Sequence, residues 1–325
     1  MALRTRLTQR LGIEYPIMSA PMAFVAGGKL AAAVTAAGGF GLIGGGYGDG
    51  EWLEREFAAA GNVRVGCGFI TWSLALQPEL LERSLAHMPA AVMLSFGALK
   101  PFSSIIKASG AQLICQVQTL AHAHEAVAAG ADFIVAQGGE AGGHGGSRAT
   151  FTLVPEVADY LAKAAPDTVL VAAGGIADGR GLAAALMLGA DGVLIGSRFM
   201  MSAEASFTPA LQMAATQANG DDTVKTKVLD IVRRKDWPET ITGRALRNRF
   251  VEDWHGRETA LSAPDIGAHE LERYMRAREE GDAANTGIFV GEAVGLINEV
   301  RPAGDIVRDI AAEAERLLAR GAKSY

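Results

Sequence analysis

Short apolar runs alternate with stretches of helical spacing along the first 200 residues of the chain. A half-exposed strand would alternate apolar and polar positions, whereas these runs are almost continuously apolar and are bounded mainly by glycine or proline. Continuous runs of this length are typical of parallel strands that are covered on both faces. Eight of them predict strands, at residues 17–20, 40–44, 63–70, 91–96, 112–117, 133–136, 169–173 and 192–196.

The stretches between these runs predict helices. Three of them end in a glycine, at Gly38, Gly130 and Gly189, and a glycine takes the left-handed conformation after a helix at little cost. A last amphipathic helix, over residues 306–318, is assigned as the helix that completes the fold. The other predicted helices cover residues 29–37, 51–60, 77–87, 103–109, 121–129, 155–165 and 181–188.

Eight strand–helix units within about 200 residues predict an α/β fold, a closed (β/α)8 TIM barrel. A doubly wound open sheet is the alternative, but no Gly-x-Gly-x-x-Gly sequence opens the first helix. Residues 205–284 lack apolar runs and are rich in charge. We therefore expect residues 1–204 with 285–325 to form the barrel, and residues 205–284 to form a helical insertion, a lid over its C-terminal mouth.

Composition and charge exclude several classes of function. Glycine makes up 40 of the 325 residues, about 12% against a usual ~7%, which indicates many tight turns or places where the backbone approaches a ligand. A net charge of −6 gives no reason to expect a nucleic-acid surface. Cys67 and Cys115 lie far apart in apolar runs, and no signal peptide or uninterrupted apolar span is recognisable. We therefore expect a cytoplasmic protein without a membrane partner.

Glycines stand at the ends of the last two predicted strands, in Gly174-Gly175 and in Gly196-Ser197. The loops after strands seven and eight form a common phosphate site in barrels, because exposed backbone N–H groups there can point at an anion. The alternative is that these glycines only make turns. We predict a phosphate-bearing ligand, because a phosphate could be bound by both loops.

The loop after the sixth predicted strand is the most unusual segment, with six glycines in residues 136–146. It places His144 on a mobile, exposed loop at the barrel mouth, where a neutral imidazole can accept a proton near pH 7. The alternative is that His144 only caps a turn. Glu140 in the same loop either orients the loop or pairs with a cation. No histidine has the spacing of a metal site.

Other residues at strand ends complete the candidate site. Gln116 and Gln118 lie at the end of strand five and Gln137 at the end of strand six, where polar side chains of a barrel point to the site rather than the core. Ala20, Pro21 and Met22 follow the first strand. They either line a flat aromatic ligand or belong to the ordinary core.

Five segments together resemble the nitronate monooxygenase family, formerly called 2-nitropropane dioxygenases. They are residues 16–22, 138–144, 174–181, 192–199 and 242–248. The resemblance extends over nearly the whole chain and implies an FMN-binding TIM barrel in which His144 is the catalytic histidine. It implies a phosphate on Gly174, Gly175, Gly196 and Ser197, an isoalloxazine against Ala20, Pro21 and Met22, and further cofactor contacts at Gln116, Gln137, Gly142 and Gly143. Two positions depart from the family pattern: Gly68 stands near a common asparagine, and Glu292 stands where several relatives have glutamine.

Three functions remain open on this basis. The first is oxidative denitrification of alkyl nitronates by an FMN-dependent nitronate monooxygenase that uses O2. The second is an NAD(P)H-dependent FMN reductase of quinones or enoyl thioesters. The third is a barrel that stores or senses flavin without catalysis. A homodimer is compatible with all three.

Overall fold

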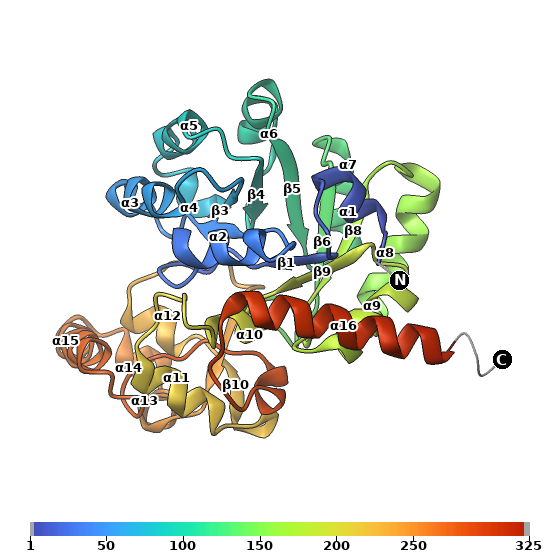
Figure 1. The fold of residues 1–325 in the computed structure, drawn as a ribbon. Coiled ribbons are helices and arrows are strands. Elements are labelled where there is room, and N and C mark those ends of the chain that lie inside the picture. The colour runs from blue at the N-terminus through green and yellow to red at the C-terminus, as the bar shows by residue number, and fades with distance from the viewer. Residues whose placement is uncertain (1–2, 322–325) are drawn as a thin grey trace.

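The computed structural model describes residues 3–321 and contains the predicted closed barrel (Figure 1). Its eight parallel strands follow the order β1-β9-β8-β6-β5-β4-β3-β2, and a bridge between Met18 and Phe40 joins the two ends of the sheet. The predictions of a TIM barrel and of all eight strands are confirmed. The strands are β1 (Ile17–Ser19), β2 (Leu42–Gly44), β3 (Gly66–Ile70), β4 (Ala91–Ser95), β5 (Gln112–Val117), β6 (Phe133–Gln137), β8 (Val169–Ala173) and β9 (Gly192–Ile195).

The predicted helices between the strands are present, with shifted ends. Gly38, Gly130 and Gly189 have φ angles of 93°, 76° and 95°, as expected for glycines that terminate helices. The helix expected to begin at Pro155 begins five residues earlier, at Thr150, so Pro155 lies inside the helix. The bounds are α2 (Gly28–Ala36), α3 (Gly50–Ala60), α4 (Thr71–Leu74), α5 (Glu79–Ala86), α6 (Lys100–Ala108), α7 (Leu120–Ala128), α8 (Thr150–Ala164), α9 (Gly179–Met187), α10 (Ser197–Met200) and α16 (Ala303–Gly321).

Successive residues of each strand belong to two different cores. In β4, Ala91 and Met93 face the barrel interior, whereas Val92 and Leu94 pack under the surrounding helices. The interior core also contains Leu7 and Leu11 of α1 (Arg6–Leu11), a helix that the sequence analysis did not predict. Every strand is therefore buried on both faces, which explains its continuous apolar run.

The segment after β9 is not wholly helical, and this corrects the sequence prediction. It contains strands β10 (Thr223–Thr226) and β11 (Thr242–Leu246), which pair antiparallel with each other. Strand β11 also pairs with β7 (Gly143–Gly145) of the loop after β6. These strands are short, and Lys225 and Arg244 interrupt their apolar character, so no apolar run marked them in the sequence.

The helices of the same segment lie below the barrel in Figure 1, in yellow and orange. They are α11 (Pro209–Thr216), η1 (Gly220–Asp222), α12 (Val228–Val232), α13 (Arg249–Trp254), α14 (Glu258–Leu261) and α15 (Pro264–Glu280), and η2 (Glu292–Leu296) follows them. One cluster of buried hydrophobic residues lies within this segment, and a second joins the segment to the barrel. We call residues 205–284 the insertion.

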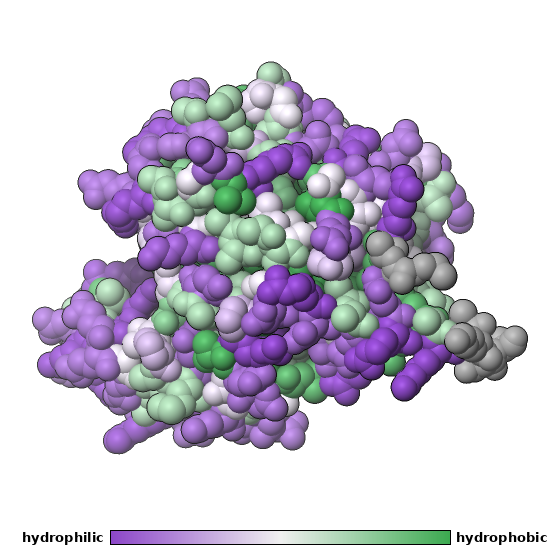
Figure 2. All heavy atoms as spheres, viewed as in Figure 1, coloured by the Kyte–Doolittle hydropathy of each residue, from purple (hydrophilic) through white to green (hydrophobic). Residues whose placement is uncertain are grey.

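The visible face of the molecule is mostly hydrophilic, with small hydrophobic areas scattered over it (Figure 2). None of the helices within residues 3–321 is both long enough and apolar enough to cross a membrane.

Candidate active site

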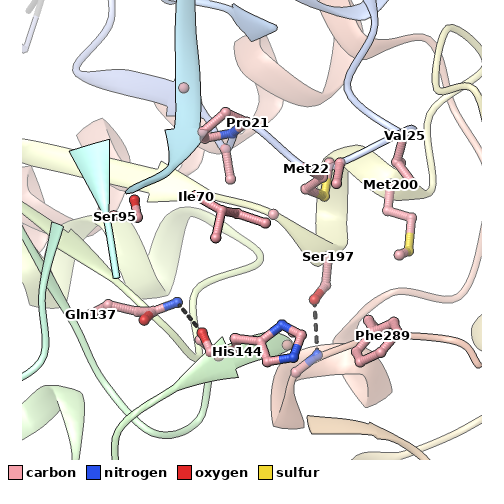
Figure 3. Close-up of a pocket in the computed structure, with 18 of the residues that line it drawn as sticks. Pro21, Met22, Val25, Ile70, Ser95, Gln137, His144, Ser197, Met200 and Phe289 are labelled. Carbon is pink, nitrogen blue, oxygen red and sulfur yellow. Dashed lines mark hydrogen bonds between the residues drawn. The ribbon is translucent and has the colours of Figure 1, made fainter. Parts of the chain in front are cut away.

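One pocket opens at the C-terminal ends of the barrel strands, between the barrel and the insertion (Figure 3). Its volume is about 1560 Å³ when the solvent at its mouth is included. The proposed catalytic histidine and all the proposed cofactor contacts line this pocket, whereas Glu140 does not. The set consists of Ala20, Pro21, Met22, Gln116, Gln137, Gly142, Gly143, His144, Gly174, Gly175, Gly196 and Ser197.

His144 is held more firmly than the sequence analysis expected. It lies in β7, where it pairs with Gly243 of β11, and only 9% of its side chain is exposed. The expectation of an exposed histidine is therefore wrong for its side chain. The glycines around it serve to fold the loop back against a strand of the insertion, a long-range pairing that the local sequence does not reveal.

The imidazole of His144 is bound by two residues of the insertion. Its Nε2 lies 2.9 Å from both carboxylate oxygens of Asp230 in α12. Its ring stacks on Trp237, with 3.5 Å between the ring centroids and 5° between the planes. Arg233 in turn donates to Asp230 Oδ1 at 2.7 Å. Sequence reasoning missed Asp230 and Trp237, because Asp230 is 86 positions away from His144 and lies in no recognisable motif.

The surroundings of His144 favour its neutral form. Burial lowers the pKa of His144 below its usual value near 6.5, and the cation of Arg233 acts in the same direction. The carboxylate of Asp230 opposes them without reversing the shift. A neutral imidazole near pH 7 can act as a base.

Glu140 orients the histidine loop. Its carboxylate accepts hydrogen bonds from the backbone N–H of Thr150 at 3.0 Å and from the Thr150 hydroxyl at 2.9 Å. No ion pair of Glu140 is found within residues 3–321. Of the two roles left open for Glu140, the contacts therefore support orientation of the loop.

Gln137 ties the same loop to the barrel. Its side-chain amide donates to the carbonyl of His144 at 3.1 Å (Figure 3). Its oxygen accepts from the amides of Gln116 at 3.2 Å and Gln118 at 3.1 Å. Gln116 and Gln137 thus form one hydrogen-bonded chain at the pocket wall, and Gln118 is buried behind it.

The glycine-rich strand ends present unused backbone donors. Gly174 and Gly175 have φ angles of 98° and 73°, a region that glycine occupies without strain. The N–H groups of Gly174, Gly175 and Ser197 have no acceptor within the described part of the chain. The hydroxyl of Ser197 accepts from the N–H of Gly291 at 2.9 Å, which leaves its own hydrogen available to a ligand (Figure 3).

Gly68, one of the two departures from the family pattern, has a packing role. A Cβ atom at Gly68 would lie 2.4 Å from Cγ of Pro21, far closer than two carbons can approach. Glycine at this position therefore lets Pro21 reach its place in the pocket wall. At the second departure, Glu292 forms an ion pair with Arg244 at 2.7 Å.

Two arginines line the pocket, and one of them, Arg233, is paired with Asp230. Arg233 and Arg278 both come from the insertion, whereas no aspartate or glutamate lines the pocket. Within residues 3–321 there is also no group of three or more histidine, cysteine, aspartate or glutamate side chains that could hold a metal ion. Anionic ligands are the ones that this lining favours.

Known proteins resemble the chain over most of its length. The sequence model of the nitronate monooxygenase family matches residues 4–87 and 73–313. A nitronate monooxygenase of Neurospora crassa is 36% identical, with 93% of this chain and 89% of that protein aligned.

Two solved structures share the fold over nearly the full chain. FabK from Thermotoga maritima superimposes with a TM-score of 0.85 and 31% identity, over 99% of each chain. A nitroalkane oxidase from Streptomyces ansochromogenes superimposes with a TM-score of 0.78 and 26% identity, over 96% of this chain and 98% of the other. From the extent of these matches, the chain belongs to the nitronate monooxygenase family of flavin-dependent oxidoreductases.

Proposed function

We propose that the protein is an FMN-dependent nitronate monooxygenase, which oxidises alkyl nitronates with O2 and releases nitrite. The observation that carries this proposal is His144, only 9% exposed and hydrogen-bonded to Asp230, in a pocket lined by arginines and by no carboxylate. A nitronate is an anion, and a neutral nitroalkane becomes one when a base removes its α-proton. The pocket combines the base with a lining that favours the resulting charge.

The residues of the pocket fit FMN. The unused N–H groups of Gly174, Gly175 and Ser197 and the hydroxyl of Ser197 are donors of the kind that bind a terminal phosphate. Ala20, Pro21 and Met22 offer an apolar wall for the isoalloxazine, and Gln116 offers an amide at its edge. Gln137, Gly142, Gly143 and Gly196 complete the proposed contacts. No dinucleotide fingerprint is present for an adenylate half, which favours FMN over FAD.

The bound flavin would accept electrons from the nitronate and pass them to oxygen. The chain itself has three tasks. His144 removes the α-proton of a neutral nitroalkane and then donates a hydrogen bond to the nitronate. The stacked Trp237 keeps the imidazole plane fixed, and the apolar residues around it exclude water.

The substitution His144→Ala tests this proposal. We expect a loss of 10²–10⁴-fold in kcat/KM for nitroethane, the usual contribution of a positioned base, and a smaller loss for ethylnitronate, which has already lost its proton. FMN should stay bound and can be identified by chromatography after release, because its proposed phosphate contacts lie on other loops.

His269→Ala is the matched control, since His269 is an exposed histidine of the insertion. Equal losses on both substrates would remove the base role of His144. Rapid bleaching of the flavin by NADH, without oxygen uptake on any nitronate, would favour the NAD(P)H-dependent reductase instead. Recovery of FAD would contradict the assignment of the phosphate site.

The remaining sequence predictions stay predictions. Small molecules, an alkyl nitronate and O2, are the partners that the pocket suits. The cytoplasmic location rests on the two free, buried cysteines, and the homodimer remains to be tested by measuring the mass in solution.

A further inference from the structure

The hydrogen bond between His144 and Asp230 determines where the imidazole proton resides. A carboxylate can only accept hydrogen bonds, and both of its oxygens lie 2.9 Å from Nε2 of His144. Nε2 must therefore carry the proton. In a neutral imidazole the other nitrogen, Nδ1, is then the one with the free lone pair.

Nδ1 of His144 has no hydrogen-bond partner among the described residues. Within residues 3–321, the one other side-chain hydrogen bond at His144 runs from Gln137 to its backbone carbonyl. Because His144 lines the pocket, Nδ1 is the nitrogen that remains for a ligand.

Arg233 holds the carboxylate of Asp230 in place. Asp230 is 5% exposed, and Arg233 donates to it at 2.7 Å. The guanidinium is itself held over the ring of Phe289, 4.7 Å from the centroid, and by the carbonyl of Leu229 at 2.8 Å. The carboxylate of Asp230 thus accepts from Arg233 as well as from His144, and two donors hold it in place. The charge of Arg233 offsets part of the effect that Asp230 has on the pKa of His144.

We propose that Asp230 is the positioning residue of the site: it fixes the proton of His144 on Nε2 and thereby makes Nδ1 the atom that removes the substrate proton. The chemical use of Nδ1 rests on the function proposed above. The tautomer itself does not depend on that function. Asp230 acts through His144, since Asp230 does not line the pocket.

The groups that face His144 come from several elements. Asp230 lies in α12 and Arg233 directly after it, while Trp237 and Phe289 contribute uncharged rings. Tyr47, between β2 and α3, faces Trp237, whose indole N–H lies 3.2 Å from the tyrosine oxygen. Asp230 and Arg233 are therefore the charges that set the titration of His144.

Two substitutions of Asp230 separate orientation from charge. In Asp230→Ala no acceptor remains, and we expect both neutral tautomers of His144 to be populated. In Asp230→Asn the amide oxygen can still accept from Nε2, so the tautomer should persist. The negative charge that raises the pKa of His144 is lost in this variant. The fall of kcat/KM for nitroethane at acid pH should therefore move to lower pH.

Nitrogen NMR of protein labelled at its six histidines reads the tautomer directly. His144→Ala identifies the resonances of His144. We expect a protonated Nε2 and an unprotonated Nδ1 in the wild-type holoenzyme. A proton on Nδ1, or an unchanged tautomer in Asp230→Ala, would overturn the proposal whether or not the protein oxidises nitronates.

Kinetics supply the second readout. With nitroethane, we expect kcat/KM to fall on the order of 10²–10⁴-fold in Asp230→Ala, as when a triad histidine loses its orienting carboxylate, and less in Asp230→Asn. The loss on ethylnitronate should be smaller in both variants. Equal losses on the two substrates would contradict the positioning role.

Glu270→Gln is the matched control for burial and folding. Like Asp230, Glu270 is a buried carboxylate of the insertion that accepts from an arginine, Arg273 at 3.3 Å, and it also accepts from Trp254 at 3.2 Å. It does not line the pocket. We expect this variant to keep both the tautomer of His144 and the wild-type kcat/KM for nitroethane, and a loss as large as that of Asp230→Asn would contradict the proposal.

Discussion

At the scale of single residues, the chemistry depends on contacts between positions far apart in the chain. His144 was selected from the glycine-rich sequence around it, and the residue lines the pocket as predicted. Its partners could not be selected in the same way. Asp230 and Trp237 lie in a charged segment whose composition resembles that of any solvated helix, and only the folded chain brings them to the imidazole.

The pH dependence of the reaction follows from the burial of His144. Because burial lowers the pKa of His144, the neutral base persists to lower pH than for a free histidine near 6.5. We expect kcat/KM for nitroethane to be constant at neutral pH and to fall about tenfold per pH unit below a midpoint under 6.5. Stopped-flow or oxygen-electrode assays between pH 5 and pH 8 measure this profile.

A midpoint clearly above 6.5 would contradict the lowered pKa. In His144→Ala the remaining kcat/KM should not show this fall at acid pH. Such a control separates titration of the base from a general effect of acid on the protein.

At the scale of elements, the small sheet of β7, β10 and β11 holds the loop that contains His144. Arg244 of β11 donates to the carbonyl of Gly139 at 3.2 Å and to Thr223 Oγ1 at 3.0 Å. It also pairs with Glu292 at 2.7 Å. Lys225 of β10 reaches the carbonyl of Gly146 at the other end of the loop. Both ends of the loop are thus held by cations of the insertion.

Removing the contacts of Arg244 with the loop should lower the catalytic rate and leave FMN bound. In Arg244→Met we expect kcat/KM for nitroethane to fall on the order of 10- to 100-fold, because a displacement of about 1 Å at a base is costly. Arg249→Met is the control, since the Arg249 side chain is 74% exposed and pairs only loosely with Asp253, at 3.9 Å. An unchanged rate in Arg244→Met would show that the sheet pairing alone holds the loop.

The same elements show what the sequence can and cannot predict. The barrel strands were predictable because burial on both faces makes each one a continuous apolar run. Strands β10 and β11 were not, because they contain charged residues whose function is to bind a loop. Helix α1 was missed for another reason: it has only six residues, too few for a helical period to emerge.

At the scale of the whole molecule, α16 holds the fold together after the chain returns from the insertion. It packs against α2, which follows the first barrel strand, and against α9, which precedes the last one (Figure 1). Ile310 of α16 is 4% exposed and belongs to the core under the barrel helices. The predicted amphipathic helix at 306–318 is thus part of the main hydrophobic core.

Truncation of Ile310 tests this contribution. We expect Ile310→Ala to lower the free energy of unfolding by about 2–5 kcal/mol, the usual cost of such a cavity. Denaturant unfolding of the holoenzyme measures the change. Phe151→Ala provides the comparison, since the side chain of Phe151 is 70% exposed and its loss should alter stability by no more than about 0.5 kcal/mol. Similar effects of the two substitutions would contradict the role assigned to α16.

The contacts of His144 come from two parts of the molecule, and this limits how the substrate range of the enzyme can change in evolution. Its backbone belongs to a barrel loop, while its hydrogen-bonding and stacking partners belong to the insertion. An insertion exchanged between relatives would also replace Asp230, Arg233 and Trp237. Under the function proposed above, substrate range and proton transfer would then change together. Selection on one property would then act on the other, and the two halves of the molecule would have to evolve as a pair.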